Sequence, residues 1–425
     1  MNESKYNAHW ETKILSDLGS FQRGKSRHRP RNDKSLFENG HFPLVQTGEI
    51  KDANLYITSH NATYNSFGLK QSKLWPKNTL CITIAANIAE TALLGYPMCF
   101  PDSVVGFIAN PKESSELFMH YVFTYIRKAI QSSASGSIQD NINIDYLTRL
   151  KFKIPAKSYQ DGIVKTLSQI DSKIEINNQI NAELEAMAKL LFDYWFVQFD
   201  FPFDFDQGKP DASGRPYKSS GGKMVYNKQL KREIPEGWDD GTLSDVANII
   251  MGQSPPGNTY NENQNGIVFF QGSTDFGIRF PSIRQYTTHP SRIAPEDSIL
   301  LSVRAPVGTL NQALCECCIG RGLAAINEKS GSNSYLWSQM TYFKQVFDYR
   351  NSVGTTFGSI TKDDLFSLKV VLPSKDAINH FKSIVDSFHQ KIKVNSIENQ
   401  KLSELRDWLL PMLMNGQVKV GESKE

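Results

Sequence analysis

Two long stretches of the chain repeat apolar residues in alternating steps of three and four, the spacing of one helical face. The first runs from about Asp161 to Val197, and the second from about Asp376 to Met414. This period is typical of helices that pack along their length on another helix. Each helix would be about 55 Å long at about 1.5 Å per residue. Because neither helix can bury such a face alone, we predict that the two pack on each other as an antiparallel coiled coil.

Two asparagines interrupt each apolar face near its middle. They are Asn177 and Asn181 in the first stretch, and Asn395 and Asn399 in the second. Buried asparagine costs stability and fixes register in coiled coils. In an antiparallel pair all four amides would meet, so we predict a polar layer on a pseudo-two-fold axis. The alternative is that the apolar face rotates and these amides face water.

The segments that precede the two stretches resemble each other. LSDL at residues 15–18 recurs as LSDV at residues 243–246, and the segment around Gln46 recurs around Gln271. In both, short apolar runs flanked by Gly, Pro, Asn and Ser predict strands joined by loops, followed by one longer helix. An internal duplication determines the fold prediction more than any local motif does.

We therefore predict a mixed α/β fold, in which two similar α/β domains are separated by two long antiparallel helices with an internal pseudo-two-fold repeat. The predicted boundaries are 1–157 for the first domain, 158–199 for the first helix, 200–237 for a connector, 238–373 for the second domain, 374–415 for the second helix and 416–425 for a tail. In the connector, Phe alternates with Asp from Phe199 to Asp206. Exposed rings there would form a docking strip, whereas rings tucked under the neighbouring domain would be structural.

Composition narrows the class of protein. The chain has 425 residues, 40% of them hydrophobic, which fits two or three globular domains. No apolar run reaches the length of a membrane span, and residues 1–10 lack a signal-peptide core. Five cysteines without framework spacing fit a reducing, cytoplasmic setting. The cluster CECC at residues 315–318 has no second pair at zinc-site spacing, so we predict buried thiols and no metal site.

Catalytic signatures are absent from the sequence. It contains no GxxxxGK[ST], GxGxxG after a strand, HExxH or GxSxG motif, and no Asn/Asp-Pro-Pro-aromatic motif of amino-methyltransferases. We therefore predict no catalytic residue and no cofactor bound by this chain. A chain of this length without such motifs is typical of a binding or scaffolding subunit.

Charge distribution points to one candidate binding loop. Residues 1–157 carry 19 Lys and Arg against 13 Asp and Glu, a net of +6, whereas residues 238–373 carry 10 against 12, a net of −2. The first domain opens with FQRGKSRHRPRNDK, in which the cations are separated by Gly and Pro. Such a loop can follow a phosphate backbone, and arginine can read guanine through two hydrogen bonds. The alternative is a solvated basic loop. The candidate residues are Arg23, Lys25, Arg27, Arg29 and Arg31.

Polar side chains at the ends of predicted strands are further candidates. Side chains there can enter a DNA groove, although they can also cap strands or bond to nearby backbone. In the first domain these are Gln46 and Thr47, and in the second Gln253, Gln271, Ser273 and Arg304. Arg279 and Arg284 supply positive charge to the acidic second domain, and we predict that their loop contacts phosphates.

The sequence resembles the specificity (S) subunits of type I restriction–modification systems. The resemblance covers nearly the whole chain and is strongest in LLFDYWFVQFDFPFD, GRPYKSSGGKMVYN and IPEGW of the central region. SVRAPVG, GRGLAAI and LSELRDWLLPMLMNG also resemble that family. The resemblance implies two target recognition domains, each reading one half of a split site on double-stranded DNA. The helices would act as a spacer that sets the gap between the two half-sites.

The resemblance also implies partners. Two modification (M) subunits would dock on the conserved regions, and restriction (R) subunits would complete the nuclease used in host defence. S-adenosylmethionine, ATP and Mg²⁺ would then belong to those partner subunits. Two alternatives stay open: a recognition partner of a fused methyltransferase–nuclease, and a scaffold whose duplicated domains bind protein.

Overall fold

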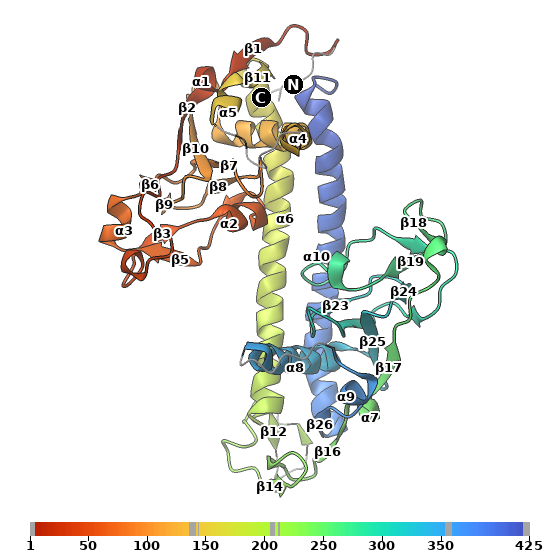
Figure 1. The fold of residues 1–425 in the computed structure, drawn as a ribbon. Coiled ribbons are helices and arrows are strands. Elements are labelled where there is room, and N and C mark those ends of the chain that lie inside the picture. Colours follow the sequence, from red (N-terminus) through yellow and green to blue (C-terminus); the bar gives the residue numbers. More distant parts are fainter. Residues whose placement is uncertain are drawn as a thin grey trace. The chain divides into compact units, whose positions relative to one another are not determined.

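The computed structural model describes residues 5–135, 142, 144–204, 209–210, 213–352 and 359–419. Its contacts divide the chain into two compact units, Met1–Ile176 with Glu398–Glu425, and Asn177–Ile397. Each unit contains one α/β domain and a segment of each of two long helices (Figure 1). Helices α6 (Lys157–Phe192) and α10 (Lys375–Met414) therefore contribute to both units.

The first unit holds a domain of three sheets. The sheet strand orders are β2-β10-β7-β8-β4, β5-β3-β9-β6 and β1-β11. The strands are β1 (Glu11–Ile14), β2 (Gly19–Arg23), β3 (Phe42–Leu44), β4 (Tyr56–Ile57), β5 (Ala62–Tyr64), β6 (Leu74–Trp75), β7 (Leu80–Thr83), β8 (Thr91–Leu94), β9 (Met98–Cys99), β10 (Val104–Ala109) and β11 (Lys151–Ile154). The helices are α1 (Leu15–Leu18), α2 (Thr47–Asp52), α3 (Ser66–Lys70), α4 (Glu116–Ser135) and α5 (Ile144–Arg149). The main core lies where α1 and α4 pack with β7, β10 and the long helices.

The second unit repeats this plan. Its domain has sheets in the orders β17-β25-β22-β23, β18-β20-β19-β24-β21 and β16-β26. The strands are β16 (Asp239–Thr242), β17 (Ala247–Met251), β18 (Tyr260–Asn261), β19 (Ile267–Phe270), β20 (Tyr286–Thr287), β21 (Ile293–Ala294), β22 (Ile299–Ser302), β23 (Leu310–Gln312), β24 (Cys317–Ile319), β25 (Leu323–Glu328) and β26 (Lys369–Leu372). The helices are α7 (Leu243–Val246), α8 (Ser334–Ser352) and α9 (Lys362–Phe366).

The predicted duplication is confirmed by strand pairs that recur in both domains. In both domains an antiparallel pair of the same kind closes the domain, β1 with β11 and β16 with β26. In both, a strand from early in the domain runs parallel to the short strand that precedes β10 or β25, and the register pairs Leu44 with Cys99 and Phe269 with Cys318. The mixed α/β class follows from strands whose two faces are buried, such as β7 and β22.

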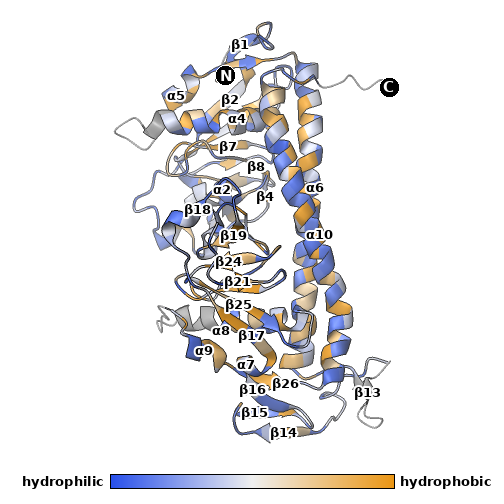
Figure 2. Ribbon diagram, turned by 90° about the vertical axis from the view of Figure 1, so that its right-hand side faces the viewer, coloured by the Kyte–Doolittle hydropathy of each residue, from blue (hydrophilic) through white to orange (hydrophobic). Residues whose placement is uncertain are grey.

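Within each unit the two long helices are antiparallel, as predicted. In the first unit Asp171 pairs with Arg406 at 3.0 Å and Lys173 with Glu398 at 3.4 Å. Residue numbers thus rise along α6 in the direction in which they fall along α10. In the second unit Asn181 meets Asn395, and Phe192 packs on Phe381 farther along. Apolar and polar stretches alternate along both helices in Figure 2. The α-helical part of α6 ends at Phe192 and one π-helical turn, Asp193–Val197, follows, so the helical segment ends two residues before the predicted boundary at residue 199.

Each domain is joined to its helix segments by buried polar contacts. In the first unit the Tyr121 hydroxyl of α4 donates to Asp171 at 2.6 Å, and burial with that carboxylate nearby raises the pKa of Tyr121. In the second unit Lys382 of α10 forms a buried ion pair with Glu328 at the end of β25, at 2.5 Å. Removing one member of such a pair leaves a buried charge without its partner, which is strongly destabilising.

The connector folds as part of the second unit. It forms short strands β12 (Phe203–Asp204), β13 (Lys209–Pro210), β14 (Met224–Asn227) and β15 (Arg232–Pro235). Phe199 and Phe201 are buried against Trp238, so of the two alternatives the structural one holds for these two rings, and they form no docking strip. The side chains from Phe203 to Asp206 lie outside the described residues. The burial of the first two rings makes them part of an aromatic core with Phe196 and Phe381.

Two cysteines of the CECC cluster are buried, and the described residues offer neither a metal site nor a membrane-spanning helix. Cys317 and Cys318 are buried in β24, and burial raises the pKa of the Cys317 thiol to about 12. The described residues include no group of His, Cys, Asp and Glu side chains able to hold a metal ion. In the same part of the chain, no helix is both long enough and apolar enough to cross a bilayer.

Candidate nucleic-acid interface

The basic loop of the first domain leaves the end of β2 and runs to β3. Arg23, the last residue of β2, donates from Nε and Nη2 to the Asp102 carbonyl at 2.9 and 2.7 Å. Arg31 donates from one nitrogen to both carboxylate oxygens of Asp102 at 2.7 and 3.0 Å. Arg29 lies 3.9 Å from the same carboxylate and bonds to loop carbonyls. The structure thus gathers three predicted arginines around one acidic turn.

Two other cations of this loop keep their charged ends free of protein. Arg27 is exposed and Lys25 half-buried, and neither side-chain nitrogen has a partner among the described residues. The loop backbone is nevertheless fixed, because the Arg27 and His28 amides donate to the Gln71 side chain at 2.7 and 3.2 Å. His28 also hydrogen-bonds Asp33, which lowers the pKa of that carboxyl to about 2. Arg27 and Lys25 are therefore presented on a defined loop and available to phosphates.

Gln46 and Thr47 lie at the start of α2. Gln46 is exposed and caps the helix, and its amide donates to Glu49 at 2.9 Å. Thr47 is half-buried as the first residue of the helix. The Gln46 side chain, at the end of β3, is the more accessible of the two.

In the second domain Gln271 and the Arg321 backbone meet at Ser254, the residue after Gln253. Gln271 Nε2 donates to Ser254 Oγ at 2.9 Å, and the Arg321 amide donates to the same hydroxyl at 3.3 Å. Gln253 and Gln271 are exposed. Ser273 is half-buried and begins a single helical turn one residue beyond Gly272. Three loop segments thus meet at one end of this domain.

The other predicted arginines of the second domain have separate environments. Arg284 is exposed and pairs with Asp275 at 2.9 Å, and these contacts raise its pKa. Arg304 is exposed, and its backbone bridges to Ser359 outside the named strands. Neither residue is joined to the Gln271 cluster by a hydrogen bond or an ion pair within the described part of the chain.

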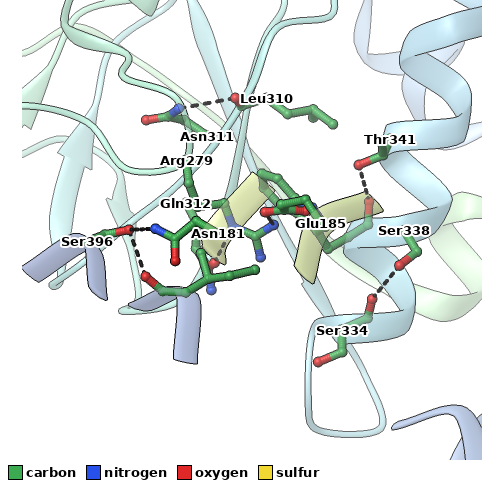
Figure 3. A network of polar contacts seen from close by, with 12 residues as sticks. Asn181, Glu185, Arg279, Leu310, Asn311, Gln312, Ser334, Ser338, Thr341 and Ser396 are labelled. Atoms are coloured by element: carbon green, nitrogen blue, oxygen red, sulfur yellow. Dashed lines mark hydrogen bonds and ion pairs between the residues drawn. The ribbon is translucent and has the colours of Figure 1, made fainter. Parts of the chain in front are cut away.

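The prediction that Arg279 contacts phosphates is wrong. Its side chain is 5% exposed and donates to Glu185 of α6 at 2.7 Å and to Gln312 at 3.0 Å (Figure 3). The guanidinium also lies over the Trp337 ring, 3.3 Å from its centroid. Burial lowers its pKa to about 10, so it stays charged at neutral pH and needs Glu185 as its partner. Arg279 therefore fixes the domain to the helix.

The four predicted helix asparagines are buried or half-buried. Asn177 and Asn395 are each 1% exposed, whereas Asn181 and Asn399 are half-buried. Asn395 Nδ2 donates to Asn181 Oδ1 at 2.9 Å, and Asn181 donates to Ser396 at 3.3 Å (Figure 3). None of the four is on a fully exposed position, which rejects the alternative of a solvent-facing set. A layer formed by all four amides stays a prediction.

Sequence reasoning missed Asp102 and Ser254, which organise the two candidate surfaces. Asp102 is a single acid between two buried strands, and nothing in the local sequence marks it as the partner of Arg23 and Arg31. No sequence signal was available, because the contact depends on the pairing of β10 with β2, which places Asp102 beside the basic loop.

Known proteins show clear similarity to the chain. The family model described as "Type I restriction modification DNA specificity domain" matches residues 7–186 and 235–407. A Methanocaldococcus jannaschii protein described as a type I restriction enzyme MjaX specificity subunit is 31% identical over 307 residues, 70% of this chain and 65% of that relative. The type I restriction enzyme MjaIX specificity subunit of the same organism is 23% identical over 97% of this chain and 94% of that one.

Two further matches extend the comparison. The type I restriction enzyme HindI specificity subunit of Haemophilus influenzae is 27% identical over 68% of this chain and 74% of its own length. A crystal structure of a type I restriction–modification system S subunit from M. genitalium matches with a TM-score of 0.57. It is 16% identical and the match covers 95% of this chain and 96% of that one, so it supports the fold.

Proposed function

Because the chain belongs to the family of type I restriction–modification DNA specificity subunits, we propose that its two domains read the two halves of one asymmetric, interrupted DNA site. As a member of that family it is a specificity subunit with two DNA-recognition domains, the first at residues 7–186 and the second at residues 235–407 of the family match. We call these the first and second recognition domains.

One observation carries the proposal: the two domains share their framework and differ in the loops at its edge. Gly24 and Gly252 occupy the same place, directly after β2 and β17. The Gly24 amide donates to the carbonyl of Val104, the first residue of β10, and the Gly252 amide to that of Leu323, the first residue of β25. The loop that follows carries five arginines or lysines between residues 25 and 34 in the first domain, and none between residues 253 and 265 in the second. Equal frames with unlike loops suit two readers of unlike sequences.

The loop chemistry supports contact with DNA. Arginine and lysine bind phosphates, and arginine also reads guanine, whereas glutamine pairs with adenine through two hydrogen bonds. The first domain offers Arg27 and Lys25 with free charged ends, and the second offers Gln253 and Gln271 on its surface. The first domain would thus depend more on charge, and the second more on neutral hydrogen bonding.

Assembly with other subunits is part of the proposal. Two modification subunits would dock on the long helices and the connector, and restriction subunits would join the full complex in the cytoplasm. Methyl transfer and cleavage, with their S-adenosylmethionine, ATP and Mg²⁺, would belong to those partners. This chain would bind no cofactor and supply the sequence recognition.

We further propose that the length of α6 and α10 sets the gap between the half-sites. DNA grooves recur about every 10–10.5 base pairs, so a fixed spacer selects a fixed gap. Inserting or deleting seven residues in each helix should change the gap or abolish binding. A variant that keeps the original gap would contradict the spacer role.

The experiment that tests the function uses the full chain together with modification subunits. Sequencing that detects methylated bases should find one interrupted motif with unlike halves. Binding of the assembled complex to DNA should also fall linearly with salt in log–log form, because phosphate contacts release counterions. Absence of DNA binding with the modification subunits present would overturn the proposal.

A further inference from the structure

The turn between β24 and β25 corresponds to the turn between β9 and β10 of the first domain. Gly24 and Gly252 each donate their amide to the first residue of β10 or β25, at 2.8 and 2.9 Å. Asp102 and Arg321 each lie two residues before that first residue. They are therefore equivalent positions in the two domains, and they carry opposite charge.

The surroundings of the two positions are also reversed. In the first domain the turn binds Arg23, at the end of β2, through the Asp102 carbonyl, and Arg31 of the following loop through the Asp102 carboxylate. In the second domain the neighbouring loop, Gln253 to Tyr260, has no charged residue, and the turn itself brings the arginine. Arg321 is exposed, and its guanidinium has no partner within the described residues. A cation at this edge is thus present in both domains, but it comes from different elements.

The backbone fixes this turn against Gln271. The Gly320 amide donates to Phe270 at 2.8 Å and the Gly322 amide donates to Gln271 at 3.3 Å. A Cβ atom added at Gly320 or Gly322 would lie 2.8 or 2.9 Å from the Gln271 carbonyl oxygen, too close for any side chain. Arg321 is therefore the one residue of this turn whose side chain can reach outward, beside the exposed Gln271 amide.

We propose that Arg321 is a specificity-determining residue of the second recognition domain and reads a guanine edge next to the base read by Gln271. This inference rests on the proposed function. The guanidinium of arginine matches guanine O6 and N7 through two parallel hydrogen bonds, and a lysine cannot reproduce that planar pair. A free guanidinium held between two glycines can approach a base edge without hindrance from its neighbours.

The test compares R321Q and R321K with the unaltered chain, each assembled in full with modification subunits. Methylated motifs are mapped first, and binding is then measured on duplexes carrying the intact site or one changed base. R321Q should bind the intact site about 10-fold or more weakly and should lose its preference at one guanine of the second half-site. R321K should lose the same preference while keeping most of its affinity for unrelated DNA, because it retains the charge.

K369Q is the matched control, since Lys369 is an exposed cation of the same domain on β26, away from this turn (Figure 1). It should leave the motif and the binding of the intact site unchanged. The inference is overturned if the complex carrying R321Q methylates the same motif and binds it with the same affinity, or if the substitution weakens binding equally on all sequences. In either case the proposed function stands. If the unaltered complex yields no interrupted motif, the proposed function itself fails.

Discussion

The two recognition domains differ in where their arginines lie. In the first domain, Arg23 and Arg31 lie on the surface around Asp102, and Arg27 is free of protein partners within the described residues. In the second, Arg279 is buried as an anchor to α6, whereas Arg321 is free at the surface. A count of charges therefore misjudges both domains, because exposure and partners decide which arginine is available to DNA.

This difference shows how one framework can carry two specificities. The strands that form the frame are buried, so their apolar pattern must be preserved in both copies. The turns at the strand ends have only a few backbone contacts to satisfy, and they can exchange an acid for a base without disturbing the core. Asp102 and Arg321 are such an exchange at one position.

The largest effect should come from breaking the anchor. Arg279→Ala leaves Glu185 without its partner and exposes the face of Trp337, so the second domain should loosen from its helix segment. We expect amides of α8, which carries Trp337, to exchange hydrogen roughly 30- to 150-fold faster, equivalent to about 2–3 kcal/mol.

Arg284→Ala provides the control for that change. The arginine of its ion pair with Asp275 is exposed, so removing it should lower the stability of the second domain by less than about 1 kcal/mol. Equal acceleration of exchange in the two variants, or none in Arg279→Ala, would show that Arg279 is not an anchor.

A smaller effect is expected from Asp102→Ala in the first domain. The substitution removes the carboxylate that holds Arg31 and adds one unit of positive charge to the loop. Unrelated DNA should bind more tightly. The preference for the correct first half-site should fall by about 5-fold, a difference in binding free energy of about 1 kcal/mol. Competition binding with duplexes altered in one half-site measures this. A reduced preference at the second half-site would contradict the assignment.

The smallest effect should follow Arg27→Gln. Arg27 has an exposed side chain and is proposed to contact phosphate. The substitution should therefore weaken binding to correct and to unrelated DNA by the same factor. The slope of log affinity against log salt should fall by about 1, which titrations at several salt concentrations would show. A change confined to one base pair would instead identify Arg27 as a base reader.

Much of the fold could be predicted from the sequence because it depends on repeated local patterns. The three-and-four spacing predicted both long helices, and the duplicated segments around Gln46 and Gln271 predicted two domains of one architecture. These signals are periodic, and each is repeated within the chain. The break at Phe192 was not predicted, because the apolar pattern continues through the π-helical turn into the aromatic core.

The candidate site was predictable only in part. The basic loop was visible as a run of cations, and the structure places it at a domain edge. Arg279 was misassigned because its partner Glu185 lies 94 residues away in sequence, and no local pattern shows that the two meet. Arg321 lies in GRGLAAI, which was noted only for its family resemblance, and its place at the edge of the domain becomes apparent only when the registers of the two domains are compared.

If each domain reads its own half-site, exchanging one domain should change only that half. The most direct measurement is a methylation map of a chimera in which residues 1–157 are replaced by the first domain of another specificity subunit, assembled with the same modification subunits. We expect the first half-site to change completely, while the second half-site and the gap stay as they are. A map in which both halves change, or neither does, would contradict this expectation.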